Sequence, residues 1–427
     1  MDKLIDFYSK EASSNHSTNP YLAKIQQDGL KTFQRLGFPS RHDEDWKYTA
    51  AAFDPFLKQE FVSAPRCSPK TLGGVPCLNR HEGYLELSIL NGEPQDFADF
   101  KALLPDGVIV ESLLTMIEKN PEQVSPYLNK IRAHEDGFQS LNTAFLQQGL
   151  VLYLSPGVIL KSPIVFKHAQ NKPNQAVYLR HLIIAEEGAS ATLIEDYSGV
   201  NETVYLTNTI TEVALAARAQ LIHYKTQRES KKAFHMGHIA VRESEGSLFQ
   251  SHSLSLGGQV VRSDLTINLK EKESSCLLNG IYIPNQHQHM DHHTRINHLT
   301  VSCESDQDYK GVLKGDGRAV FNGQVYVAPG AQHTKANQQN KNILLSPTAE
   351  IDTKPQLEIF ADDVVCAHGA TVGQLDEEAK FYLSSRGMDE ATVMQYLIQA
   401  FIANNAALIG DAGMKEWMLK LIYEEIL

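Results

Sequence analysis

The sequence predicts a mainly β protein, with a right-handed β-helix (a β-solenoid) as its core and helical regions at both ends. Turns of small residues recur from about residue 188, and each is followed by a strand of alternating apolar and polar residues. Before residue 60 and after residue 373, apolar residues instead recur at helical spacing. We therefore expect an N-terminal helical and mixed region over 1–145, the β-helix core over 146–373 and a C-terminal helical region over 374–427.

The first sixty residues are predicted to be mostly helical. Apolar residues lie near helical spacing up to residue 36, and Gly37 and Pro39 end that helix. Residues 40–49 then read as a charged turn anchored by Trp46. Residues 60–145 are mixed, with strands broken by proline and glycine and a helix-like stretch over 100–128.

The spacing of turns predicts the β-helix. Six turns are centred on residues 188, 218, 246, 274, 305 and 330, so the steps run from 25 to 31 residues. A period in this range, with strands and no helices between the turns, is typical of a solenoid. We expect strands over 151–154, 177–184, 191–194, 204–213 and 220–224. A stack of irregular β-sandwich hairpins is the alternative architecture.

Three helices are predicted after Gly373. Asp376 and Gly387 are a plausible N-cap and C-cap for the first helix, and the second begins near Asp389. The third carries one apolar stripe of Met414, Trp417, Met418, Leu421 and Ile422. Such helices can pack against the end of the chain's own β-helix, bind a partner, or do both.

The composition indicates a globular protein and excludes several functions. Hydrophobic residues make up 42% and charged residues 21% of the 427 residues. A formal net charge of −12 argues against binding to nucleic acid or to anionic lipid. No apolar run is long enough to span a membrane, and the N-terminus lacks the features of a signal peptide. Five scattered cysteines without a Cys-x-x-Cys pair are typical of a reduced protein, so we expect a cytoplasmic location.

The segment 354–373 holds the most informative candidates for a site. Two short apolar strands, 357–360 and 364–365, flank a polar corner, and Cys366 and His368 follow. Residues two apart in a strand project from the same face, so the thiol and the imidazole would point at one target. Both are ligands of borderline or soft metals, but two ligands cannot close a tetrahedral site. The remaining ligands would then come from elsewhere, and we expect another chain to supply them. A buried cysteine near a turn beside a hydrogen-bonded histidine is the structural alternative.

A second group of candidates is the histidine-rich segment 285–298. It contains His287, His289, His292, His293 and His298. The first two of these could share one strand face, as in the metal sites of cupins, although the further carboxylate and distant histidine of a cupin are not found at a recognisable spacing. The alternative function is therefore a metal-dependent β-helix or cupin-like enzyme that uses the His287–His298 cluster.

Other catalytic motifs are missing from the sequence. There is no G-x-x-x-x-G-K-[ST] loop, no G-x-G-x-x-G before a helix and no G-x-S-x-G. A nucleophile with its base does not emerge either. We therefore expect no enzyme, and any ATP hydrolysis linked to this chain needs a partner.

Segment 354–373 resembles the most distinctive stretch of the SufB/SufD family of iron–sulfur cluster assembly proteins, and in its details the SufD branch. The resemblance rests on K-P-Q-L-E-I-F-A-D-D-V followed by C-x-H-G-A-T-V-G, and on Tyr382–Gly387. The R-x-x-E-x-W-K-Y-T element that begins at Arg41 and the pattern Asp291-x-x-Thr294-x-x-x-His298 add to it. It covers roughly residues 20–410, and the length and the absence of an N-terminal cysteine motif favour SufD over SufB. The tail after Leu408 is less familiar.

The resemblance implies a non-catalytic scaffold subunit of a SufBCD-type complex. A SufB-like β-helix subunit would pair with this chain, a SufC-like ABC ATPase would bind its C-terminal helices, and nascent iron–sulfur clusters would be assembled at the heterodimer interface. Cys366 and His368 would be transient iron–sulfur ligands, with no cluster held stably by the isolated chain. Aromatic anchors often dominate such interfaces, so we expect the ATPase to contact Phe381, Tyr382, Leu397 and Phe401. When the chain is alone, the edge that pairs with SufB could pair with a second copy as a homodimer.

Overall fold

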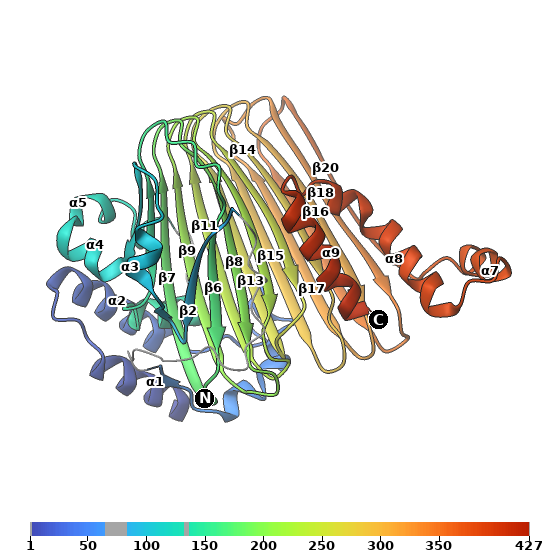
Figure 1. Ribbon diagram of the computed structural model, residues 1–427, viewed down its shortest axis with the longest axis horizontal. Helices are drawn as coiled ribbons and strands as arrows, with labels where there is room; N and C mark the ends of the chain where they lie inside the picture. Colours follow the sequence, from blue (N-terminus) through green and yellow to red (C-terminus); the bar gives the residue numbers. More distant parts are fainter. Residues whose placement is uncertain (1, 65–82, 132–135, 427) are drawn as a thin grey trace.

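The computed structural model describes residues 2–64, 83–131 and 136–426. Its centre is a β-solenoid built from two parallel sheets that face each other (Figure 1). Neighbouring strands within a sheet are two apart in sequence order, because each coil gives one strand to each sheet. The predicted β-helix core is therefore confirmed, and the alternative of β-sandwich hairpins is wrong.

The main strands of the solenoid are mostly eight to eleven residues long. The first sheet contains β5 (Leu150–Leu154), β7 (Gln175–Ala185), β9 (Leu206–Leu215), β11 (Phe234–Glu243), β13 (Val260–Leu269), β15 (His289–His298), β17 (Arg318–Val327) and β19 (Glu350–Ile359). The second contains β6 (Ile164–Gln170), β8 (Ser190–Gly199), β10 (Gln220–Arg228), β12 (Leu248–Ser255), β14 (Ser275–Tyr282), β16 (Glu304–Leu313), β18 (Thr334–Leu344) and β20 (Val364–Gly373).

The N-terminal region covers one end of the solenoid. Strand β2 (Leu85–Leu90) pairs with β6, β4 (Val108–Ser112) pairs antiparallel with β5, and the short β3 (Glu93–Pro94) and β1 (Val62–Ser63) pair with β2 and β7. The helical segments are α1 (Asp2–Ser14), α2 (Pro20–Leu36), η1 (Glu44–Trp46), η2 (Ala50–Phe53), η3 (Phe56–Lys58), α3 (Phe97–Lys101), α4 (Leu113–Lys119), α5 (Pro121–Val124) and α6 (Gly137–Ala144). The helix-like stretch predicted over 100–128 is thus broken by β4, which follows a turn at Gly107 with φ 81°. The three-part domain division stays a prediction.

The C-terminal helices begin and end where their caps predict. They are α7 (Glu377–Ser385), α8 (Glu390–Ala407) and α9 (Ala412–Ile426). The Asp376 carboxylate accepts hydrogen bonds from the N–H groups of Glu378 and Ala379, and Gly387 takes φ 90° just after α7. Helices α8 and α9 pack on the outer face of the second sheet, where residues such as Ile398 and Met418 share one apolar cluster with strand residues (Figure 1). The stripe of α9 therefore covers a sheet face.

Helix α7 differs from α8 and α9. It buries no residue and lies at the tip of the C-terminal region, away from the solenoid (Figure 1). Among the helices of the described ranges, none is long and apolar enough to cross a membrane.

Candidate functional site

The solenoid is uncovered at the end opposite the N-terminal region. Strands β19 and β20 are the last strands of the two sheets, and in the described part of the chain each has a neighbour on one side only (Figure 1). Both are ten residues long, and neither contains a fully buried residue, whereas most residues of the inner strands are buried. A long strand edge presents unpaired N–H and C=O groups and is a template for pairing with another chain.

Apolar side chains lie exposed at this open end. Phe360 is 59% exposed and Val365 73% exposed, and Val372 and Ile359 are exposed to 48% and 38%. Apolar side chains gathered at one exposed place mark interaction sites. Because the unpaired edges and these side chains lie on the same strands, or directly after them, the open end is the strongest candidate for a pairing surface.

Cys366 and His368 lie in β20, at the open end. Their register partners in β18 are Ala336 and Gln338, which are both buried inside the solenoid. Cys366 is half-buried against an apolar cluster that includes Ala336 and Leu357, while His368 is exposed. The thiol and the imidazole therefore stand two residues apart on the last strand, where a partner strand would cover them.

The isolated chain supplies little that would activate this thiol. Burial raises the pKa of Cys366, and a backbone hydrogen bond at Ala336 opposes that effect only in part. Neither Cys366 nor His368 belongs to a group of three or more metal-ligating side chains within the described residues. Burial thus disfavours the thiolate, and a closed metal site at this position needs ligands besides these two residues.

Two segments that carry the family resemblance are joined on the outer face of the first sheet. Lys354 pairs with Glu44 at 2.7 Å, which ties segment 354–373 to the turn before Thr49. The Arg262 guanidinium lies 4.3 Å from the ring centroid of Trp46 and pairs with Asp291 at 2.6 Å. These contacts hold the N-terminal turn against the solenoid and give Glu44 and Lys354 a structural role.

The histidine-rich segment does not form a shared metal site. His287 is exposed in the turn before β15 and pairs with Asp316. His289 contacts Thr49 on one face of β15, while His292 stacks on Tyr282 inside the solenoid. Because His287 lies in the turn before β15, with φ 60°, it does not share a strand face with His289. Within the described residues, no three of the five histidines form a metal-ligating group. The expectation of a cupin-like site here is not supported.

The candidate ATPase contacts on the C-terminal helices divide into two pairs. Phe381 and Tyr382 of α7 are 77% and 58% exposed. Leu397 and Phe401 of α8 are half-buried against the apolar cluster under α8 and α9. The Phe401 carbonyl also accepts a hydrogen bond from Lys310 at 2.6 Å, so this residue contacts the solenoid. Of these four candidates, the aromatic pair of α7 offers the larger exposed surface.

Comparison with known families agrees with this architecture. The model of the SUF system FeS cluster assembly SufBD core domain matches residues 168–401, and that of the SufBD protein N-terminal region matches residues 1–166. The chain belongs to the SufB/SufD family. This membership supports a role in iron–sulfur cluster assembly.

Individual SufB/SufD relatives cover nearly the whole chain. Iron-sulfur cluster assembly protein SufD of Escherichia coli K12 is 32% identical over 412 residues, which are 94% of this chain and 92% of the relative. The SufD protein of Bacillus subtilis is 24% identical over 98% of this chain and 97% of its own length. A SufBD family protein of Synechocystis is 28% identical over 94% of this chain and 90% of the relative. The resemblance to the SufD branch is thus confirmed.

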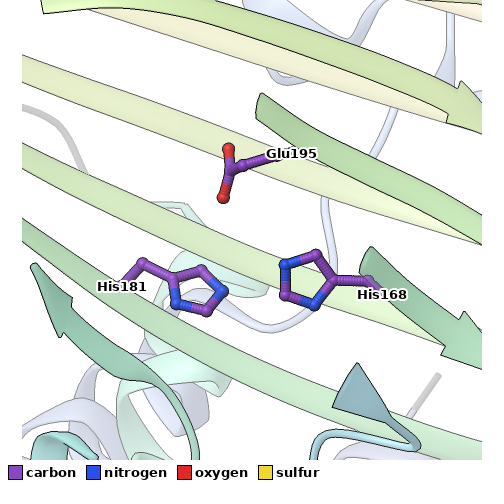
Figure 2. A group of neighbouring side chains, drawn as sticks. All are labelled: His168, His181 and Glu195. Atoms are coloured by element: carbon purple, nitrogen blue, oxygen red, sulfur yellow. The ribbon is translucent and has the colours of Figure 1, made fainter. Parts of the chain in front are cut away.

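One group of metal-ligating side chains was not found from the sequence. His168, His181 and Glu195 converge inside the solenoid (Figure 2). They come from β6, β7 and β8, so no local spacing connects them. Only the winding of the coils brings them together.

Proposed function

We propose that this chain is a non-catalytic scaffold subunit of a SufBCD-type complex in the cytoplasm. In this proposal a SufB-like subunit pairs with the open end of the solenoid, and a SufC-like ABC ATPase binds the C-terminal helices. Nascent iron–sulfur clusters form at the heterodimer interface, with Cys366 and His368 as transient ligands.

The observation that carries the proposal is the open end itself. Both sheets end in a ten-residue edge strand, β19 and β20, and Cys366 and His368 lie on β20. A related solenoid can continue both sheets by adding its own last strands, since strand addition uses main-chain hydrogen bonds along the whole edge. The same edge supports pairing with a second copy of this chain when the SufB-like subunit is absent.

The thiol of Cys366 and the imidazole of His368 suit a cluster that is bound only transiently. Stable iron–sulfur clusters normally have several cysteine ligands, whereas this chain offers one thiol and one imidazole. Burial raises the pKa of Cys366, so the free subunit holds a protonated thiol. Iron or a basic group of the partner would remove that proton, so ligation would begin only on assembly.

The C-terminal helices support an ATPase contact, but one made by fewer residues than the sequence predicted. Helix α7 presents Phe381 and Tyr382 to solvent and buries nothing. Aromatic side chains that become desolvated typically dominate an interface. Leu397 and Phe401 contribute from α8, where they also contact the solenoid cluster. The docking surface is therefore centred on α7.

Purification from the native host tests the proposal. The tagged full-length chain should carry two partners, one ABC ATPase and one related β-helix chain. The purified complex should build an iron–sulfur chromophore on reconstitution, whereas the isolated chain should not retain one. Isolation of the tagged chain without either partner, or a stable cluster on the chain alone, would contradict it.

A further inference from the structure

Three buried side chains converge inside the solenoid, in its early coils. His168 is 5% exposed, Glu195 1% and His181 fully buried. One ligand atom from each lies within 4.8 Å of the other two, and Figure 2 shows both rings and the carboxylate directed at one another. His168 and Glu195 belong to neighbouring strands of one sheet and His181 to the facing sheet. The group is therefore separated from the open end by the later coils.

Three of the four imidazole nitrogens of this group lack a partner among the described residues. Both ring nitrogens of His168 and Nε2 of His181 make no hydrogen bond with any described residue. Buried polar atoms without a partner are costly and rare, so three of them on two adjacent rings indicate a missing ligand. Glu195, in contrast, is held in place by Tyr197 at 3.2 Å and by His223 at 3.0 Å.

Each member of the group has the charge state that suits cation binding at neutral pH. Burial lowers the pKa of His168 and His181, so both rings are neutral. Burial disfavours ionisation of Glu195, but the hydrogen bond and charge of His223 outweigh it and hold the pKa of that carboxyl well below its usual range. Two neutral imidazoles and one carboxylate are a donor set for iron or zinc.

We propose that His168, His181 and Glu195 bind one divalent transition cation, of the Fe²⁺ or Zn²⁺ class, inside the solenoid. A cation at the centre of a triangle with sides of 4.8 Å lies about 2.8 Å from each corner. Bonds to such ions are about 2.0–2.2 Å long, so each side chain must move inward by less than about 1 Å. A cavity with room for about one water molecule, lined by His168 and Tyr197, adjoins the group and can supply a further ligand.

The surrounding charges favour a cation. Glu195 and a second buried carboxylate, Glu229, lie near the buried Lys225. His235 lies between Glu229 and that lysine, at 2.7 Å and 3.1 Å. Lys225 reaches Glu229 through His235, whereas Glu195 faces an incoming ion beside its contact with His223 at 3.0 Å.

One hydrogen bond sets a condition on binding. The N–H group of Leu150 donates to Nδ1 of His181 at 3.2 Å, so the neutral ring carries its proton on Nε2. Ligation through Nε2 requires the other tautomer and gives up this long hydrogen bond. His168 has no such restriction, because neither of its nitrogens is bonded.

The test uses the full-length chain with Cys366→Ser and His368→Ala, so that the open-end pair cannot bind metal and the result is independent of the proposed function. After removal of metal by a chelator, the chain should take up one equivalent of Zn²⁺, anaerobic Fe²⁺ or Co²⁺. Co²⁺ should give visible d–d absorption, and Zn²⁺ should raise the melting temperature. Adding His168→Phe keeps the ring stacked on Tyr197, whose centroid lies 4.5 Å away, and should weaken binding about 100-fold or more.

His292→Phe is the matched control. His292 also stacks on a tyrosine inside the solenoid, with centroids 5.0 Å apart, and its Nε2 is also without a partner in the described residues. It belongs to no group of three metal ligands there, so its replacement should leave cation binding unchanged. Absence of one tightly bound equivalent in the parent, or equal binding by His168→Phe, would overturn the proposal. If His168→Phe does not fold, the Co²⁺ spectrum of the parent decides, since absence of d–d bands refutes the site.

Discussion

The double substitution Val365→Ser and Val372→Ser tests whether the open end is the surface that binds a SufB-like subunit. Complete burial of a valine side chain stabilises by about 1.5–3 kcal/mol. Val365 is 73% exposed and Val372 48% exposed, so covering both should contribute about 2–3.5 kcal/mol to pairing. Replacing both valines with serine should remove most of this pairing free energy. A loss of about 2 kcal/mol raises Kd about thirtyfold.

The assay is titration calorimetry of the full-length variant with the SufB-like subunit. Both valines are exposed in the free chain, so the melting temperature should change little. Ile159→Ser is the matched control, because this side chain is 70% exposed and lies between β5 and β6, in the first coils of the solenoid. If the valine variant binds as tightly as the Ile159 variant, the open end is not the pairing surface.

Three further predictions concern the rest of the chain. Replacing both Phe381 and Tyr382 with alanine should weaken ATPase binding by about 2 kcal/mol or more, measured by co-purification and calorimetry, because both are exposed aromatics on α7. Glu212→Gln should lower the free energy of unfolding in urea by about 3–5 kcal/mol, because it removes the buried carboxylate that pairs with the fully buried Arg180 at 2.9 Å. Stability should fall as pH drops from 6.5 towards 4, because burial lowers the pKa of His292 to about 4 while the unfolded chain takes up the proton near 6.5. At pH 5 the loss is about 2 kcal/mol for this ring, so His292→Phe should reduce the loss by that amount.

Each of these predictions has a control and a result that would refute it. Leu103→Ala removes a 60% exposed side chain from the N-terminal region and should not affect the ATPase; equal binding by the α7 variant would exclude α7 as the contact. Glu187→Gln breaks an exposed pair with Arg218 and should hardly change stability, so an equally small effect at Glu212 would contradict the ion-pair argument. A pH profile that is unchanged in His292→Phe would show that this ring does not titrate as its burial requires.

The repeat of the solenoid could be predicted because each turn is marked by a short run of consecutive residues. The expected strands 177–184 and 204–213 match β7 and β9, and small residues such as Gly188, with φ 66°, stand in the turns between strands. Strand β6 was missed because its sequence, Ile164–Gln170, has three apolar residues followed by mostly polar ones and does not alternate. The expected turn at 304–307 lies inside β16, since the chain turns earlier, at Ser302 with φ 58°.

Contacts between distant segments were less predictable. The apolar stripe of α9 was recognised, but that it covers the outer face of the second sheet depends on the path of the whole chain. Cys366 and His368 were found because they lie only two residues apart in the sequence. That they lie at the open end depends on β20 being the last strand of its sheet. His168 and Glu195 become neighbours only through the register between β6 and β8, which no spacing in the sequence specifies.

Cluster reconstitution on the assembled complex with His368→Ala tests the central claim most directly. His368 is exposed on the last strand, so the variant should fold and assemble with both partners in the same ratio as the unaltered chain. The claim predicts that its iron and sulfide content and its visible absorption fall well below those of the unaltered complex, because loss of a ligand weakens metal binding about tenfold or more. Full reconstitution by His368→Ala and, separately, by Cys366→Ala would show that the pair does not ligate the cluster.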